Sequence, residues 1–378
     1  MSQVQEKSGG AHIPALDGLR GVAILLVLFI HFGGQASLPG FFHRLAYMGW
    51  MGVDLFFVLS GFLISKILLE SRSSPGYFKN FYIRRALRIF PLYYFILLVG
   101  VFALPPFLSE AAVKTYLDGS VSSAGYLFTY MTNFAVIFIP GLTFGAFGHF
   151  WSLAVEEHFY LLWPTVIKWL DKKHLIAICL VIMAFSLLIR IGWLSSGQAW
   201  GGAYLLSFCR IDSLACGALL ALWIDGRSRE EMHQYFLKAR WLLKHWAWVM
   251  LILFFLIKPF YPSHWFVVTV GLTMLAIVAA CLVLICLNEM PETKIKTIMQ
   301  MKWLKWFGKY SYGIYVVHFP IATIMREVTP VSGLKEHWPL LGGWLFVLAG
   351  VILSSVVALG SFHGLERPFL KMKRRFAY

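Results

Sequence analysis

The stretch LDGLRGVAILLVLFIHF, residues 16–32, decides the fold class. It lies within an apolar run at about 15–35, which is long enough to cross the hydrocarbon core of a bilayer as one helix. The run carries Arg20 near one end and His31 near the other. We therefore expect a transmembrane helix with an ionisable side chain toward each membrane surface.

The rest of the chain has the composition of a polytopic membrane protein. Of its 378 residues, 59% are hydrophobic, and the mean hydropathy is +0.71. Charged residues make up 13%, against about 25% in soluble domains, and this hydrophobicity excludes a disordered chain. The apolar runs are continuous and do not alternate, which disfavours a membrane β-barrel. We expect one all-α membrane domain over residues 1–378, without a fused soluble domain.

Ten apolar runs are long enough to span a bilayer. An eleventh stretch, 123–140, is broken by polar residues and bounded by Pro140-Gly141, so we expect a re-entrant or interfacial helix there. The ten expected spans cover about 15–35, 50–69, 90–107, 149–168, 175–195, 203–224, 244–258, 264–287, 310–327 and 340–362.

The net charge of +15 is unevenly distributed along these spans. With ten spans and both termini cytoplasmic, 26 of the 33 Lys and Arg residues fall on the cytoplasmic side, as the positive-inside rule requires. If 123–140 crossed the membrane, this bias would be lost. We expect a multi-pass membrane protein whose basic side faces the cytoplasm and anionic lipid, and we expect no nucleic-acid partner.

Ionisable residues inside spans are costly and are therefore candidates for function. Most of them fall in the outer half of their spans, which predicts a polar cavity open to the outside. Besides His31, these candidates are Asp54, Glu156, Glu157, His158, Arg190, Arg210, Asp212 and His318.

The first span carries three ionisable residues, Asp17, Arg20 and His31. Arg20 and His31 are eleven residues apart, which leaves about 20° of rotation and places both on one helix face, about 16 Å apart along the axis. Asp17 precedes Arg20 by three residues and can pair with it. The alternative is structural: Arg20 anchors the helix at the membrane surface, and His31 is a hydrogen bonder between helices.

A second basic feature is Arg85 and Arg88, which share a helix face at i, i+3 just before the third span. Arginines held at the inner membrane surface suit a phosphorylated ligand from the cytosol, because the guanidinium fork binds phosphate in a bidentate manner. The alternative is an anchor for anionic lipid.

The fourth span carries adjacent carboxylates, Glu156 and Glu157. Neighbours on a helix point about 100° apart, so we expect only one of them to face the cavity. A basic partner such as Arg190, Arg210 or His31 is expected for it, and Ser152 shares the face of Glu156 at i, i+4. The alternative is a structural buried pair.

Six blocks together resemble the acyltransferase-3 family of integral membrane O-acyltransferases. The resemblance covers essentially the whole chain. The blocks are LDGLRGVAILLVLFIHF (Leu16–Phe32), GVDLFFVLSGFLIS (Gly52–Ser65), RRALRIFPLYY (Arg84–Tyr94), HFWSLAVEEHFYLLWP (His149–Pro164), YGIYVVHFP (Tyr312–Pro320) and LERPF (Leu365–Phe369).

The resemblance implies a ten-span enzyme of the bacterial inner membrane. Such an enzyme moves an acyl group, usually acetyl, from cytoplasmic acyl-CoA to a hydroxyl of a glycan or glycolipid, such as O-antigen, exopolysaccharide or peptidoglycan. Some members carry a fused extracytoplasmic SGNH-hydrolase domain. We expect none here, so transfer would be direct or would need a separate periplasmic partner. The family's Arg-x10-His, Arg-x-x-Arg and acidic pair fall on Arg20 and His31, on Arg85 and Arg88, and on Glu156 and Glu157.

The residue patterns and the resemblance predict one mechanism. CoA phosphates bind Arg85 and Arg88, with help from Arg20, and no metal is expected. His31 is the general base or a transient acyl carrier, and Glu156 or Glu157 orients its imidazole. Candidate supporting residues are Asp17, Asp54, Trp151, Ser152, Arg210, Asp212, Tyr312 and His318, of which Trp151, Ser152 and Tyr312 are candidate oxyanion donors.

Two other classes of protein stay open at this point. A transporter of a polar solute or glycolipid would have internal repeats and interrupted helices in matching halves, and the sequence shows neither clearly. A sensor or assembly subunit without chemistry would tolerate replacement of His31.

Overall fold

The computed structural model describes residues 13–36, 38, 40–108, 110–117, 123–257, 261–287, 293–328, 333 and 341–376. This part of the chain is helical and contains no strand. The α-helices are α1 (Pro14–Leu28), α2 (Gly40–Tyr47), α3 (Met51–Glu70), α4 (Tyr77–Leu98), α5 (Glu110–Leu117), α6 (Ala124–Phe128), α7 (Thr132–Phe138), α8 (Trp151–Trp169), α9 (Lys172–Ser195), α10 (Trp200–Leu205), α11 (Ser207–Ile224), α12 (Arg229–Leu256), α13 (Leu272–Leu287), α14 (Lys294–Met299), α15 (Lys302–Val328), α17 (Gly342–Ser361) and α18 (Arg367–Met372).

Short π- and 3₁₀-turns join or extend these helices. The π-turns are η1 (Phe29–Gly33), η3 (Val99–Ala103), η6 (Val267–Gly271) and η7 (Phe362–Glu366), and the 3₁₀-turns are η2 (Met48–Trp50), η4 (Pro105–Phe107), η5 (Gly145–Phe150) and η8 (Lys373–Phe376).

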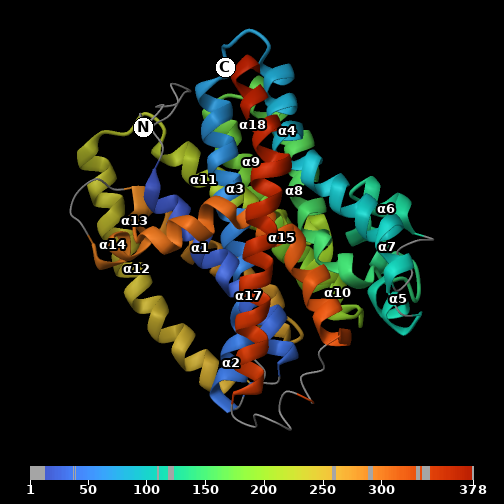
Figure 1. Ribbon diagram of the computed structural model, residues 1–378. Coiled ribbons are helices and arrows are strands. Elements are labelled where there is room, and N and C mark those ends of the chain that lie inside the picture. The colour runs from blue at the N-terminus through green and yellow to red at the C-terminus, as the bar shows by residue number, and fades with distance from the viewer. Residues whose placement is uncertain are drawn as a thin grey trace.

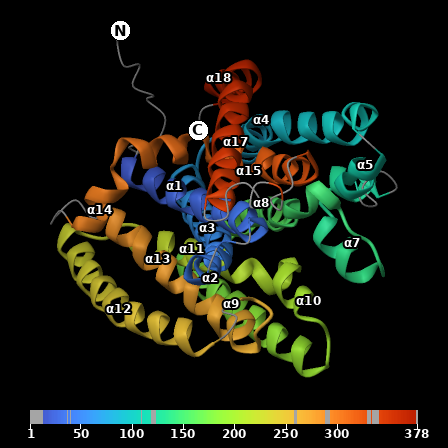
Figure 2. The ribbon, with the colours of Figure 1, turned by 60° about the horizontal axis from the view of Figure 1, so that its bottom comes forward.

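A central group of helices carries the ionisable residues. Helix α1 packs against α3 and α15, α3 packs against α11, and α11 packs against α9. Figure 1 shows α5, α6 and α7 together on one side of this group and α12, α13 and α14 on the other, and Figure 2 shows the same separation from below. Between these two outer groups, helices α1, α3, α4, α8 and α15 surround one central space.

Seven helical segments in the described part of the chain are long and apolar enough to cross a membrane. They cover seven predicted spans: 15–35, 50–69, 90–107, 175–195, 203–224, 264–287 and 340–362. Helices α8, α12 and α15, of 19, 28 and 27 residues, cover the three remaining predicted spans but lie outside that set. Residues 258 and 340, each at the end of a predicted span, lie outside the described residues. The chain is a multi-pass membrane protein, and the count of about ten spans stays a prediction.

Several helices extend beyond the predicted spans or divide within them. Helix α4 begins at Tyr77, whereas the predicted span begins near residue 90, so Pro91 lies inside the helix. Helix α12 begins at Arg229, well before 244. The predicted span 203–224 is divided at Leu206, whose extended backbone separates α10 from α11. Apolar run length marks the lipid-facing part of a helix, whereas the helix itself continues through its charged turns.

The stretch 123–140 contains α6 and α7, helices of five and seven residues. At about 1.5 Å per residue, neither is long enough to cross a hydrocarbon core of about 30 Å. They are separated by Tyr130, a non-glycine residue with a φ of 57°.

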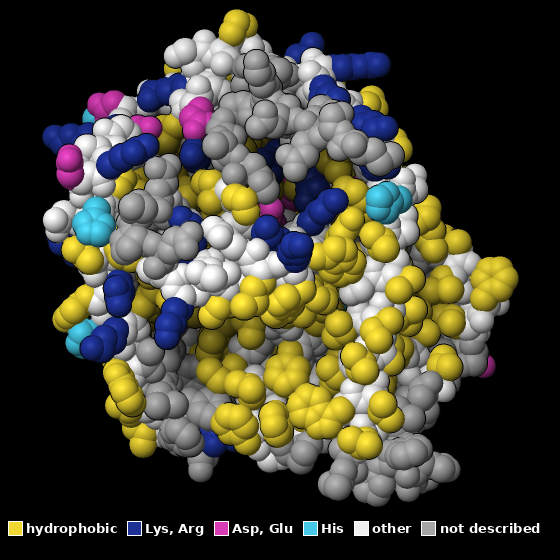
Figure 3. Space-filling view, turned by 60° about the vertical axis from the view of Figure 1, so that its left-hand side comes forward, with side chains coloured by type: hydrophobic (Ala, Val, Ile, Leu, Met, Phe, Trp, Pro, Cys, Tyr) yellow, Lys and Arg dark blue, Asp and Glu magenta, His cyan; other side chains and the backbone are white. Residues whose placement is uncertain are grey.

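The surface separates basic from apolar residues. Figure 3 shows Lys and Arg side chains gathered over the upper part of one face and a broad hydrophobic area below them. Large apolar side chains are exposed on many helices, among them Leu161, Leu188 and Val356. This pattern is typical of a protein whose sides contact lipid and whose basic end faces anionic headgroups.

Helices α3 and α11 approach each other through two glycines. A Cβ added to Gly61 would overlap the backbone carbonyl of Leu214, and one added to Gly217 would overlap that of Val58. Small residues of this kind let helix backbones approach closely in membranes. The glycines therefore set the spacing of the two helices that carry Asp54 and Arg210.

Gly217→Ala is expected to destabilise the protein by about 1–3 kcal/mol, because the added methyl has to push α3 and α11 apart. The matched control is Gly192→Ala on α9, where a Cβ meets nothing within 4 Å and alanine should be neutral or slightly stabilising. Thermal unfolding in detergent compares the two variants. Equal midpoints would show that α3 and α11 can separate at no cost.

Candidate active site

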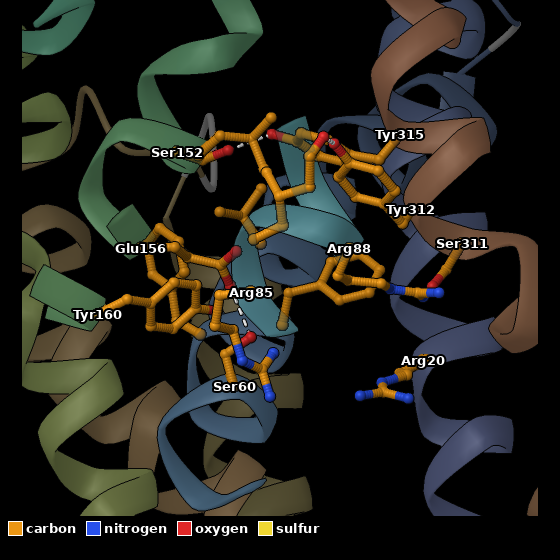
Figure 4. A pocket seen from close by; sticks show the side chains of 15 residues that line it. Arg20, Ser60, Arg85, Arg88, Ser152, Glu156, Tyr160, Ser311, Tyr312 and Tyr315 are labelled. Atoms are coloured by element: carbon orange, nitrogen blue, oxygen red, sulfur yellow. Dashed lines mark hydrogen bonds between the residues drawn. The ribbon is translucent and has the colours of Figure 1, made fainter. Parts of the chain in front are cut away.

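One pocket lies at the centre of α1, α3, α4, α8 and α15. It holds about 700 Å³, including its open mouth. Each of the five helices contributes at least one polar side chain, as Figure 4 shows. The polar lining residues are Arg20, Ser60, Arg85, Arg88, Ser152, Glu156, Tyr160, Ser311, Tyr312 and Tyr315.

One end of the pocket is basic. Arg85 and Arg88 share one face of α4, as their spacing predicted, and Arg20 of α1 joins them. The guanidinium of Arg85 lies over the rings of Phe81 and Tyr160. Neither Arg85 nor Arg88 forms a salt bridge within the described part of the chain, and the Nε of Arg85 is buried there without a hydrogen-bond partner. Arg85 and Arg88 therefore bring to this end two guanidinium groups that form no ion pair with a described carboxylate.

Arg20 is partly neutralised by its own helix. Its Nη1 lies 3.4 Å from Oδ1 of Asp17, which confirms the predicted i, i+3 pair. Both side chains remain partly exposed, so the pair leaves Arg20 able to contact a ligand in the pocket.

Glu156 faces the pocket, and Glu157 does not line it. Oε1 of Glu156 accepts a hydrogen bond from the Ser60 hydroxyl at 2.6 Å. Oε1 of Glu157 is buried without a hydrogen-bond partner among the described residues. Ser152, one turn before Glu156, lines the same pocket, as its i, i+4 spacing predicted.

The other end of the pocket is formed by hydroxyl groups. The hydroxyls of Ser152 and Tyr315 are hydrogen-bonded to each other. Both also lie within hydrogen-bond distance of the carbonyl oxygen of His149, at 3.2 and 3.1 Å. Tyr312 lines the pocket as well, but its hydroxyl donates to the carbonyl oxygen of Ile89 at 2.5 Å. The hydroxyls of Ser152 on α8 and Tyr315 on α15 thus bind each other, whereas the hydroxyl of Tyr312 binds the backbone of α4.

His31 lies outside the pocket lining and pairs with His318. Nδ1 of His31 is 2.9 Å from Nε2 of His318, and Nδ1 of His318 is 2.6 Å from the carbonyl oxygen of Tyr315. A carbonyl only accepts hydrogen bonds, so Nδ1 of His318 carries the hydrogen. Its Nε2 then accepts in the neutral ring, and Nδ1 of His31 donates. Nε2 of His31 keeps its lone pair.

The backbone around His31 is a π-turn. Helix α1 ends at Leu28, and His31 is the central residue of η1. The eleven-residue count from Arg20 therefore does not run through a regular α-helix. Single π-turns inside helices often occur at functional sites.

Four predicted residues form two buried ion pairs outside the pocket. Nη2 of Arg210 is 2.8 Å from Oδ1 of Asp54, and Nη2 of Arg190 is 2.8 Å from Oδ2 of Asp212. Trp151 belongs to this region too, because the guanidinium of Arg210 lies over its ring.

The expected contacts of the carboxylates were therefore wrong. Arg190 and Arg210 are paired with aspartates, and the partner of His31 is His318, so neither Glu156 nor Glu157 holds the imidazole. Asp54 and Asp212 meet the two arginines in separate pairs between helices instead of in one cavity.

Five residues of this region were missing from the prediction. Ser60, Tyr160, Ser311 and Tyr315 line the pocket, and the backbone carbonyl of His149 lies within hydrogen-bond distance of the hydroxyls of Ser152 and Tyr315. Tyr315 precedes His318 by three residues, so the i, i+3 rule applied to α15 would have found it. Ser60 carries no such signal, since its partner Glu156 lies on another helix.

Comparison of the sequence with known proteins identifies its family. The sequence model of the family described as "Acyltransferase domain" matches residues 13–360. The chain is 29% identical to "Peptidoglycan O-acetyltransferase OatA" of Listeria monocytogenes, over 95% of this chain and 56% of that protein. It is also 29% identical to "Putative peptidoglycan O-acetyltransferase YrhL" of Bacillus subtilis, over 94% of this chain and 55% of that protein.

The chain thus spans about half the length of these curated relatives. No solved structure matches it significantly. The family match extends over nearly all of the described helices and includes every residue of the pocket. The chain therefore belongs to the acyltransferase-domain family.

Proposed function

We propose that the chain is an O-acyltransferase of the bacterial inner membrane that moves an acyl group, acetyl above all, from acyl-CoA to a hydroxyl of a cell-envelope saccharide. One observation carries the proposal. A single pocket has arginines at one end and the Ser152–Tyr315 pair at the other, and Tyr315 in turn contacts His318, the partner of His31. The arginines at the first end can bind phosphate groups, and His31 can transfer a proton.

The basic end suits acyl-CoA as the donor substrate. Guanidinium groups bind phosphate through paired N–H donors, and Arg20, Arg85 and Arg88 present three of them to one space. The buried Nε of Arg85 is a donor that an anionic ligand would satisfy. With the phosphates held there, the thioester reaches toward Ser152 and Tyr315.

His31 supplies the base in this proposal. Because His318 holds its Nδ1, the lone pair of Nε2 is directed away from the pair and can take the proton of an acceptor hydroxyl. A second route uses the same nitrogen as nucleophile, so that the acyl group passes through an acyl-histidine before it reaches the acceptor.

The acceptor belongs to the cell envelope. Two relatives are named for the O-acetylation of peptidoglycan. O-antigen, exopolysaccharide or a lipid-linked sugar offers the same hydroxyl chemistry. A separate periplasmic partner completes the transfer where the acceptor does not reach the membrane domain itself.

The test uses purified protein in detergent or liposomes with acetyl-CoA labelled in the acetyl group and a saccharide acceptor. The proposal expects label in an ester of the saccharide and release of free CoA in equal amount. Movement of a solute across the liposome membrane without ester formation would support a transporter instead. Absence of both ester and CoA release with every envelope saccharide tried would overturn the enzymatic function.

Arg85→Ala should weaken acetyl-CoA binding by about 10- to 100-fold, since one charge-assisted hydrogen bond contributes about 1.5–3 kcal/mol. Isothermal titration with CoA measures this directly. The matched control is Lys79→Ala, which removes an exposed cation of the same helix outside the pocket. If CoA binds both variants as it binds the wild type, the arginines are anchors for anionic lipid.

A further inference from the structure

The hydroxyls of Ser152 and Tyr315 close the pocket at the end away from the arginines. Ser152 lies in the first turn of α8, and Tyr315 lies midway along α15. Figure 4 shows the two oxygens turned toward each other, with Glu156 between them and the basic end. We propose that this pair is the oxyanion site of the transferase: the two O–H groups bind the acyl carbonyl and stabilise the negative charge that develops on its oxygen. The assignment rests on the proposed function.

The hydrogen-bond pattern shows why this pair is suited to that task. Two hydroxyls and one carbonyl oxygen, that of His149, are mutually within hydrogen-bond distance. The carbonyl only accepts, so one hydroxyl hydrogen points to it and the other points to the partner hydroxyl. Both donors are thus held in place before any ligand arrives. An acyl oxygen beside the pair can receive both hydrogens when each O–H turns about its C–O bond from its present acceptor, and donors held this close are more effective than reorganising water.

The other polar residues of the pocket are less suited to this role. Tyr312 already donates to the carbonyl of Ile89, and the hydroxyl of Ser60 donates to Glu156. Glu156 is an acceptor when ionised and would repel an oxyanion. The hydroxyls of Ser152 and Tyr315 lie beside each other, and among the described residues their other acceptor is a neutral carbonyl oxygen and not a carboxylate.

The position of Tyr315 links the pair to the base. Its side chain lines the pocket, whereas its backbone carbonyl accepts the hydrogen bond that fixes His318, the partner of His31. The rings of Tyr315 and His318 are 5.4 Å apart. One helix, α15, therefore positions both the donor to the acyl oxygen and the histidine that orients the base.

The step can be written with all atoms placed. The oxygen of the acceptor hydroxyl forms a bond to the acyl carbon, and the C=O electrons move onto the oxygen held by Ser152 and Tyr315. His31 takes the hydroxyl proton. The carbonyl then re-forms, the carbon–sulfur bond breaks, and His31 returns the proton to the sulfur, so that an ester and free CoA leave. The acyl-histidine route places the same oxyanion in the same site.

Tyr315→Phe and Ser152→Ala each remove one donor. Each should lower kcat by about 10²- to 10³-fold, the usual cost of one oxyanion donor, while KM for acetyl-CoA and CoA binding stay within about threefold of the wild type. Ser152→Thr keeps the hydroxyl and should recover most of the activity lost in Ser152→Ala. The matched control is Tyr77→Phe, which removes a buried tyrosine hydroxyl bonded to the carbonyl of Pro164, away from the pocket.

Each result decides for or against the pair. A role limited to holding α8 against α15 predicts lower unfolding midpoints with unchanged kcat per folded molecule, and that result would overturn the proposal. So would a raised KM with unchanged kcat. If Tyr315→Phe does not fold, the Ser152→Ala and Ser152→Thr comparison decides alone. If the wild-type protein shows no turnover, the proposed function is refuted. If the wild type is active and both variants keep its rate, only the oxyanion site is refuted.

Discussion

His31→Ala is expected to lower O-acetyl transfer by about 10²- to 10⁴-fold, the range that a positioned general base supplies. Nδ1 of His31 is held by Nε2 of His318, and His318 is in turn fixed by the carbonyl of Tyr315. Alanine removes the basic Nε2 nitrogen and leaves the arginines untouched. The rate of CoA release by purified protein measures the loss, and CoA binding should remain that of the wild type.

A matched control separates this effect from the loss of any histidine. His245→Ala removes an exposed imidazole whose Nδ1 contacts only the carbonyl of Trp241 on its own helix. It should leave transfer unchanged. Undiminished transfer in His31→Ala, at equal protein level, would reduce His31 to a hydrogen bonder between η1 and α15 and would assign the base to another residue.

Features that repeat along one helix could be predicted from the sequence. Arg85 and Arg88, Ser152 and Glu156, and Asp17 and Arg20 share a face through i, i+3 or i, i+4 spacing, and the structure confirms that each pair lies together. The positions of the helices follow from run length in the same way. Their ends do not, because α4 continues through Arg84–Arg88, where hydropathy falls but the helical hydrogen bonds persist.

Pairings between helices could not be predicted. Asp54 and Arg210 are 156 residues apart, and His31 and His318 are 287 apart. Nothing in the spacing of either pair indicates which helices become neighbours. Close contacts at Gly61 and Gly217 bring α3 and α11 together, and these contacts are made with the backbone of the partner helix. The prediction therefore found most residues of the site but paired the acids with the wrong cations.

Asp54→Asn is expected to destabilise the protein by about 3–5 kcal/mol, because it leaves the charge of Arg210 buried without a counter-ion. Both side chains of the pair are 0% exposed. Around the guanidinium lie the rings of Tyr204, Phe57 and Trp151, which attract a cation but cannot neutralise it. Asparagine keeps the volume of aspartate, so the loss reports the charge and not a cavity. Denaturant titration in detergent micelles measures the free energy of unfolding.

Asp225→Asn is the matched control, since Asp225 pairs with Lys172 at 3.4 Å where both side chains are about half exposed. A surface pair contributes about 0–1 kcal/mol, so this variant should unfold almost as the wild type does. Replacing Asp54 and Arg210 together by apolar residues of similar size should restore most of the stability, because no unpaired charge then remains. An Asp54→Asn protein as stable as Asp225→Asn would mean that water reaches Arg210 from the neighbouring pocket, and the pair would then belong to the site instead of to its scaffold.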